Sequence, residues 1–176
     1  IGNPPYIQLQ KKLSETDVTK YADLYKNQGF ETFERTGDIY SLFYEKGINT
    51  LKHKGTLSYI TSNKWMRAKY GKSLRKFFSE HNPLLLLDLG PGVFETATVD
   101  TNIIQIEKDS NQEELKAVTI NEKESIQILN DSDFINMRNL NEESWIILKL
   151  QEQKIKDQIE RVGTQLKDWE IEIYRG

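Results

Sequence analysis

Local patterns of apolar and polar residues predict three helices in the first half of the chain. In residues 13–27, which Ser14 or Asp17 can cap, three side chains share a helical face: Val18, Tyr21 and Tyr25. In a second stretch, which Asp38 can cap and which ends near residues 52–55, four apolar side chains do so: Ile39, Leu42, Phe43 and Leu51. Residues 61–63 can cap a third helix over residues 64–79, which His81-Asn82-Pro83 ends.

Shorter apolar runs predict strands between and after these helices. Residues 56–60 alternate and are rich in β-forming types, and residues 84–89, 102–107 and 116–121 are further strand candidates. Gly90-Pro91-Gly92 marks a turn after the second of these strands. Helices and strands that alternate, followed by an antiparallel-looking pair, are typical of an α/β open sheet. We expect this chain to form the second half of such a sheet.

The pattern changes at Asn141. From there to Gly163, apolar side chains repeat at helical spacing: Trp145, Leu148, Ile155, Ile159 and Val162. This predicts one long amphipathic helix, and a strand-like run over residues 169–174 follows it. We therefore expect half of an α/β domain over residues 1–138, a helical connector over residues 139–165, and the truncated start of a further domain over residues 166–176.

Composition narrows the possible chemistry. The 176 residues are 37% apolar and 29% charged, which is typical of a globular protein, and the absence of cysteine excludes disulfides, thiolate nucleophiles and cysteine zinc sites. His53 and His81 are isolated, so no metal site is predicted. The opening residues do not resemble a signal peptide, and the longest apolar run, residues 84–87, is too short to span a bilayer. We expect a cytoplasmic protein that does not contact membranes.

The net charge of −3 conceals two oppositely charged parts. Residues 1–81 carry 14 basic and 8 acidic side chains, a net charge of +6, whereas residues 82–176 carry 10 and 19, a net charge of −9. Six cations fall within 13 residues that contain no acid: Lys64, Arg67, Lys69, Lys72, Arg75 and Lys76. Trp65 and Tyr70 are interleaved with them. This run is the best candidate for contact with nucleic-acid phosphates, and a solvated helix face is the alternative.

The segment Asn3-Pro4-Pro5-Tyr6 carries the most specific chemistry. Two consecutive prolines make a stiff, extended turn whose carbonyl groups stay free to accept hydrogen bonds. The Asn3 side-chain oxygen and the Pro4 carbonyl can each accept one hydrogen of an exocyclic NH2 group, while Tyr6 stacks on the ring that bears it. This arrangement orients the amine and stabilises the positive charge that develops as it attacks an electrophilic methyl group.

With this motif the chain resembles the N6-adenine DNA methyltransferases that use S-adenosylmethionine, more narrowly the methylase part of TaqI-like, type IIG restriction-modification enzymes. Residues 1–7 are similar to the catalytic motif of that family, and residues 38–43 and 54–62 to its next helix and strand. Residues 87–104 resemble the segment with a second base-contacting aromatic. Residues 166–176 resemble the entry to the DNA specificity domain.

The resemblance implies a Rossmann-like fold, double-stranded DNA as partner and a role for each matched residue. Asn3 and Pro4 would hold the target amine, Tyr6 would stack on the adenine and Phe94 would contact its other side, while Pro5 and Phe43 would line the adenine end of the methyl donor. The glycine-rich donor-binding loop of the family lies upstream of its catalytic motif and is absent from these residues. We therefore expect a fragment of a longer polypeptide that neither binds the donor tightly nor methylates DNA by itself.

Two other interpretations stay open. The same motif occurs in enzymes that methylate glutamine amides or RNA guanine amines, and a non-catalytic DNA-binding subunit could keep it after losing the donor site. Some relatives fuse a nuclease, and Glu152-Gln153-Lys154 superficially offers the Glu-x-Lys of a nuclease, although no Pro-Asp precedes it.

Overall fold

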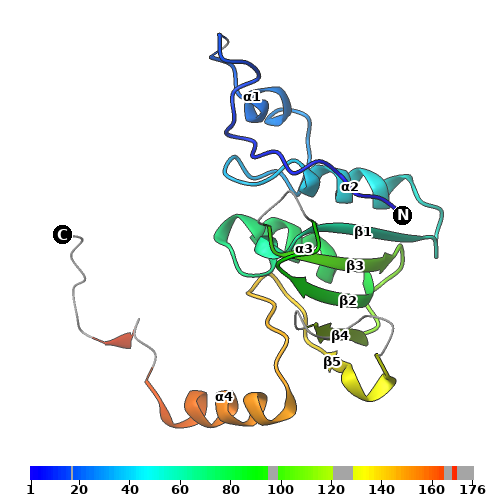
Figure 1. Cartoon of the computed structure of the whole chain (residues 1–176), viewed down its shortest axis with the longest axis vertical. Helices are drawn as coiled ribbons and strands as arrows, with labels where there is room; N and C mark the ends of the chain where they lie inside the picture. Colours follow the sequence, from blue (N-terminus) through cyan, green and yellow to red (C-terminus); the bar gives the residue numbers. More distant parts are fainter. Residues whose placement is uncertain (17, 95–98, 121–128, 165–167, 170–176) are drawn as a thin grey trace.

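The computed structural model describes residues 1–16, 18–94, 99–120, 129–164 and 168–169. It contains a five-stranded mixed sheet in the order β1-β3-β2-β4-β5, flanked by helices (Figure 1). The strands are β1 (Thr56–Ser62), β2 (Asn82–Gly90), β3 (Thr101–Glu107), β4 (Leu115–Thr119) and β5 (Ile135–Met137). The α-helices are α1 (Tyr21–Tyr25), α2 (Tyr40–Thr50), α3 (Lys72–Ser79) and α4 (Leu150–Val162). Short 3-10 helices are η1 (Asn63–Met66), η2 (Lys69–Gly71) and η4 (Asp131–Asp133). The predicted α/β class is confirmed.

Strand β3 lies between β1 and β2 and is antiparallel to both, whereas β2 and β4 are parallel. Thr101 at the start of β3 pairs with Ser62 at the end of β1 and with Gly90 at the end of β2. The last residues of β1 and β2 therefore lie beside the first residue of β3, where these strands end. The candidate site is built at these strand ends.

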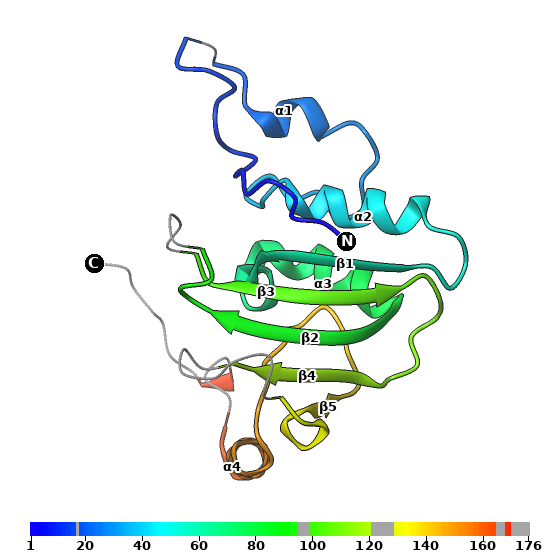
Figure 2. The ribbon, with the colours of Figure 1, turned by 45° about the vertical axis from the view of Figure 1, so that its right-hand side comes forward.

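The N-terminal residues extend the sheet beyond β1. Gly2 forms a parallel bridge with Tyr59, its N–H donates to Ser58 O at 3.0 Å, and its carbonyl accepts from Ile60 N at 3.1 Å. A Cβ at Gly2 would lie 2.8 Å from the Tyr59 ring, so glycine permits this close approach. The segment that follows is thereby fixed beside the second half of β1 (Figure 2).

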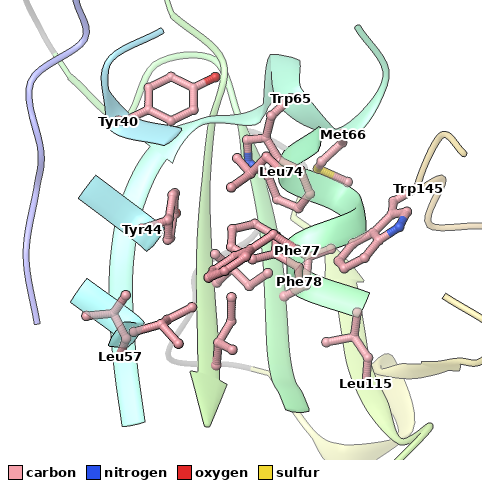
Figure 3. Packing of buried hydrophobic residues seen from close by; sticks show 14 of the residues in the cluster. Tyr40, Tyr44, Leu57, Trp65, Met66, Leu74, Phe77, Phe78, Leu115 and Trp145 are labelled. Atoms are coloured by element: carbon pink, nitrogen blue, oxygen red, sulfur yellow. The ribbon is translucent and has the colours of Figure 1, made fainter. Parts of the chain in front are cut away.

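The main core lies between one face of the sheet and the helices α2 and α3. Its largest members are aromatic, with Trp65, Phe78 and Trp145 in mutual contact (Figure 3): Trp65 meets both other rings edge to face, and Phe78 and Trp145 are tilted against each other. The opposite face carries a smaller apolar cluster centred on Leu87 and Val118. Burial on both faces explains why β2 reads as a continuous run of leucines and not as an alternating strand.

Two predicted helices are shorter than the sequence indicates. Residues 13–27 form only the short helix α1, because Leu13 N donates to Thr19 O and Lys12 pairs with Lys20, which closes a loop before the helix. Residues 64–79 are divided into η1, η2 and α3. Ser62 caps η1 as predicted, and its Oγ accepts from Lys64 N at 3.3 Å. A Cβ at Gly71 would clash with the carbonyl oxygen of Trp65, so the chain folds back on itself too tightly for one continuous helix.

The prediction of one long helix from Asn141 is wrong in its first part. Residues 141–149 are not helical, and Trp145 is 2% exposed, with its backbone N–H donating to Met66 O at 2.9 Å. Burial of this large ring against the aromatic core outweighs the helical spacing. Helix α4 follows and stands apart from the sheet in Figures 1 and 2. Most of the predicted strand at 169–174 lies outside the described residues.

Candidate functional site

The segment Asn3-Pro4-Pro5-Tyr6 leaves the sheet edge immediately after the bridge at Gly2. Pro4 is buried, whereas Asn3 and Pro5 are exposed. Tyr6 turns back toward the sheet, and its hydroxyl donates to Ile60 O at 3.2 Å. The buried Pro4 and the bonded Tyr6 therefore hold this segment in place, while Asn3 is exposed.

Tyr6 lies beside the second aromatic residue that the sequence selects. The rings of Tyr6 and Phe94 are 6.4 Å apart, centroid to centroid, in an edge-to-face arrangement, and Tyr40 lies 6.2 Å from Tyr6 in the same manner. Phe94 reaches this position from the end of β2 through a turn in which Gly90 and Gly92 both have positive φ. The structure thus brings together Tyr6 and Phe94, which are far apart in the sequence.

The start of α2 is tied to the same segment. Ile39 N donates to Ile7 O at 2.9 Å, and Gln8 forms an antiparallel bridge with Asp38. The Asp38 carboxylate does not cap the helix as predicted, because it accepts instead from the Tyr70 hydroxyl at 3.3 Å. Burial raises the pKa of Asp38, and burial raises the pKa of Tyr70 to about 12. Neither residue is predicted for the site from the sequence, since only the fold places Asp38 beside Tyr6 and Tyr70 against Asp38.

A cleft of about 550 Å³ opens beside Tyr6. The first wall belongs to the segment that follows the motif and includes Gln8 and Lys11. Further lining residues are Asp38 and Tyr40 at the start of α2, Ser62 at the end of β1, Lys64 in η1 and Val99 before β3. Lys64 is the one member of the predicted basic run in this cleft. Lys11 was missed, because nothing in its sequence context distinguishes it from the neighbouring Lys12.

Phe43 lies on the outer side of α2. We expected its ring on the apolar face of the helix, but it is 40% exposed, whereas Leu42 beside it is buried. Pro5 is exposed as well. Two apolar side chains on neighbouring segments are therefore uncovered, and the Phe43 ring does not belong to the core.

Five members of the basic run are exposed and one is not. Lys64, Arg67, Lys69, Lys72 and Lys76 are exposed, whereas Arg75 is 4% exposed. The Arg75 guanidinium donates to three backbone carbonyls, those of Trp65, Ala68 and Glu142. The structure therefore removes Arg75 from the predicted phosphate contacts, because its donors already hold η1 and the segment around Glu142 to α3.

Two of the exposed lysines have acidic neighbours. Lys72 Nζ lies 2.9 Å from Glu142, and Lys76 Nζ lies 3.8 Å from Glu80. The hydrogen bond between Lys72 and Glu142 raises the pKa of the lysine and lowers that of the carboxyl. An anion that binds Lys72 must therefore compete with Glu142.

The candidate nuclease pair on α4 has a structural explanation. The Glu152 carboxylate accepts from the backbone N–H of Lys149 at 2.8 Å, which caps the start of the helix. Among the described residues, no three histidines, aspartates or glutamates are grouped as a metal site would require, and no helix is both long and apolar enough to cross a bilayer.

Comparison with known protein families identifies the motif-bearing half. Residues 1–94 match the model of the Eco57I restriction-modification methylase family, which is more than half of the chain. The chain belongs to this family. The matched region contains the segment Asn3 to Tyr6, helix α2 and Phe94, which are the parts that form the site. The resemblance to restriction-modification methylases is thereby confirmed.

Curated relatives of this methylase family are much longer than the chain. It is 34% identical over 113 residues to the type II restriction enzyme and methyltransferase RM.Eco57I of Escherichia coli, covering 63% of the chain and 11% of that protein. It is 32% identical over 81 residues to the type II methyltransferase M.BstVI of Geobacillus stearothermophilus, covering 46% of the chain and 13% of that protein. The chain therefore corresponds to roughly a tenth of these relatives.

Solved structures share the fold at low sequence identity. The DrdV–DNA complex superposes with a TM-score of 0.61 at 13% identity, over 82% of the chain and 18% of that protein. The ATP-dependent type ISP restriction-modification enzyme LlaBIII, bound to DNA, gives a TM-score of 0.60 at 18% identity, over 82% and 12%. These similarities support a partial Rossmann-like domain for this methylase family member.

Proposed function

We propose that this chain is part of a type II restriction-modification methyltransferase that transfers a methyl group from S-adenosylmethionine to N6 of an adenine in double-stranded DNA. The observation that carries the proposal is the meeting of Tyr6 and Phe94 beside an exposed Asn3. The family supplies the class of reaction, and the site supplies groups suited to a planar base with an exocyclic amine. RM.Eco57I, a curated relative, is itself named a methyltransferase.

The target amine would be held by two oxygen acceptors. Asn3 is exposed and would supply its side-chain oxygen, and the buried Pro4 ring fixes the backbone whose carbonyl would supply the second acceptor. Both hydrogens of the adenine NH2 group would then be hydrogen-bonded. This draws the nitrogen lone pair out of conjugation with the ring and makes the nitrogen more nucleophilic. As the nitrogen takes the methyl group from the sulfonium and becomes positively charged, these two oxygens stabilise that charge through their hydrogen bonds, and one proton of the nitrogen then leaves to water.

The base itself would be held by Tyr6 and Phe94. In the structure these rings meet edge to face, with their centroids 6.4 Å apart, so both lie beside the place proposed for the base. Reaching this site from a duplex requires extrusion of the adenine, which costs a few kcal/mol in lost stacking and pairing. Stacking on an aromatic side chain returns roughly 1–3 kcal/mol of that.

S-adenosylmethionine would supply an electrophilic methyl group. In this chain, Pro5 and Phe43 would contact its adenine ring, since both offer exposed apolar surface on neighbouring segments. The remaining donor contacts would come from the rest of the proposed parent polypeptide.

DNA would lie along the exposed part of the basic run. The part nearest the site follows directly after β1: Lys64 lies in η1, Arg67 between η1 and η2, and Lys69 in η2. Residues 139–165 would connect this half domain to a DNA specificity domain beginning near residue 166. The buried Trp145 and the Arg75 bond to Glu142 O anchor the connector to the half domain.

The proposal is tested by base extrusion in the full-length parent enzyme. A duplex with 2-aminopurine in place of the target adenine should become brighter when the wild-type enzyme binds. Tyr6→Ala should lower the rate of methylation about 5-fold to 150-fold, the equivalent of one lost base stack. Tyr6→Phe, which keeps the ring, should retain most of the activity.

Tyr25→Ala is the matched control. Tyr25 is also a partly buried tyrosine in ring contact with a phenylalanine, but it lies on α1, and it does not line the cleft beside Tyr6. Wild-type fluorescence and rate in Tyr6→Ala, together with wild-type values in Tyr25→Ala, would contradict the role of Tyr6.

A further inference from the structure

The cleft beside Tyr6 contains two lysines that come from distant parts of the sequence. Lys11 belongs to the segment after the motif, and Lys64 belongs to η1. Both side chains are exposed, and neither forms an ion pair with any described residue. Their positive charges are thus available to a ligand, unlike that of Lys72.

Both lysines rise from well-fixed backbone. Lys11 N donates to Gln8 O at 2.9 Å, and Lys11 O accepts from Tyr21 N at 3.1 Å. The N–H of Lys64 donates to Ser62 Oγ at 3.3 Å, which fixes the start of η1. A Ser hydroxyl that accepts there still has its own hydrogen to donate. The cleft is therefore built from anchored segments and contains several hydrogen-bond donors.

One acid, Asp38, faces these lysines within the cleft. Its carboxylate is half-buried and accepts from the Tyr70 hydroxyl, and the charge of Lys64 acts on it. With two ammonium groups and one carboxylate, the cleft has a net charge of about +1 when all three are ionised. A monoanion balances that charge, and a phosphodiester is a monoanion with only acceptor oxygens.

The cleft lies directly beside the place proposed for the base. Tyr6, the proposed stacking platform, is also part of the cleft wall. A nucleotide whose base lies on Tyr6 carries its own phosphates within one sugar of that ring. The volume of about 550 Å³ is sufficient for a phosphate group and its sugar.

We propose that Lys11 and Lys64 form a binding site for the DNA backbone phosphate that adjoins the extruded adenine. This inference rests on the proposed function and adds Lys11, a residue outside the predicted basic run. It distinguishes one phosphate beside the target from the general electrostatic attraction exerted by Arg67 and Lys69. The site would hold the extruded nucleotide at both its base and its backbone.

The test uses the full-length parent enzyme and a 30-base-pair duplex with one adenine placed opposite an abasic site. A set of duplexes carries a neutral methylphosphonate at one phosphate at a time around that adenine. Lys11→Gln/Lys64→Gln should bind the unmodified duplex roughly eightfold more weakly at 0.1 M salt, and its slope of log K against log salt should fall by about 0.9, one phosphate contact. Affinity for S-adenosylmethionine should not change.

Lys12→Gln/Lys26→Gln is the matched control, because it removes the same charge from two exposed lysines that do not line the cleft. In wild-type and control enzymes, one methylphosphonate adjoining the adenine should cost about the same eightfold. In Lys11→Gln/Lys64→Gln, that methylphosphonate should cost nothing further.

The proposal is overturned if the two double variants behave alike, or if every methylphosphonate costs the cleft variant as much as it costs the wild-type enzyme. A loss of donor affinity in place of DNA affinity would overturn it as well, by assigning the lysines to the carboxylate of the donor. Failure of the proposed function is separate, because it would appear as the absence of methyl transfer to DNA in the wild-type enzyme.

Discussion

Replacement of Arg75 by methionine tests whether this residue is structural or contacts DNA. The guanidinium donates to Trp65 O within the core and, at 2.9 Å each, to Ala68 O and Glu142 O at partly buried positions. Methionine fills a similar volume but donates no hydrogen bond. The three carbonyls that hold η1 and the connector segment to α3 would therefore lose a shared partner.

The cost follows from the burial of each carbonyl. A buried acceptor left without a partner costs about 1–3 kcal/mol, and each partly buried one, which water can reach, costs about 0.5–1.5 kcal/mol. We expect Arg75→Met to lower the free energy of unfolding by about 2–6 kcal/mol, because these effects combine. For a chain of this size, that corresponds to a fall in Tm of at least about 4 °C.

Urea unfolding followed by tryptophan fluorescence measures this change, since Trp65 and Trp145 both lie in the core near Arg75. Lys76→Met is the control, because Lys76 is the next residue of α3 and is exposed. It should change the free energy of unfolding by less than about 0.5 kcal/mol. Unchanged stability in Arg75→Met, with a salt slope of DNA binding flattened by about 0.9 in the full-length enzyme, would refute the structural role.

Three further predictions concern acidic residues. Glu45 accepts from the backbone N–H and the hydroxyl of buried Thr32, both at 2.8 Å, so Glu45→Ala should lower the free energy of unfolding by about 2–4 kcal/mol in urea titrations. Glu142→Gln should strengthen DNA binding by the full-length enzyme and steepen its salt dependence, because Lys72 loses its competing partner; unchanged binding isotherms would argue against phosphate contact by Lys72. Burial raises the pKa of Asp38 above its usual value, so the folded state favours the protonated carboxyl over the ionised one. The protonated carboxyl contributes stability at low pH, and this contribution is lost as the pH rises through the folded pKa. Asp38→Asn should therefore be more stable than the wild-type chain at pH 7 and gain nothing below about pH 3.

The sequence predicts strands β1 to β4 well because each has its own local signal, whereas the three-residue strand β5 was not predicted. The alternating run that became β1 and the leucine run that became β2 both stand where expected, and the positive-φ glycines after β2 form the expected turn. Helix boundaries were less predictable. Trp145 fits a helical repeat by spacing, but its ring gains more by burial against Trp65 and Phe78 than the segment gains from helix formation.

The candidate site also has a part that the sequence predicts and a part that only the fold reveals. Asn3 to Tyr6 are consecutive, so their chemistry is visible in the sequence, and the fold brings Phe94 to them. Lys11 and Asp38 become neighbours of the site only through backbone pairing around Gln8, which no local pattern reveals. Arg75 is the opposite case, because the sequence predicts a phosphate contact that the fold does not provide. Its guanidinium donates instead to backbone carbonyls that come together only on folding.

The identity of the methylated nucleoside tests the central claim most directly. The full-length parent enzyme is incubated with DNA and S-adenosylmethionine that carries a labelled methyl group, and the DNA is hydrolysed and its nucleosides separated. We predict label in N6-methyladenine for the wild-type enzyme and a loss of about 100-fold or more in Asn3→Ala, with no loss in the exposed control Asn27→Ala. Label in a cytosine product, in RNA or in protein, or full activity in Asn3→Ala, would contradict the account.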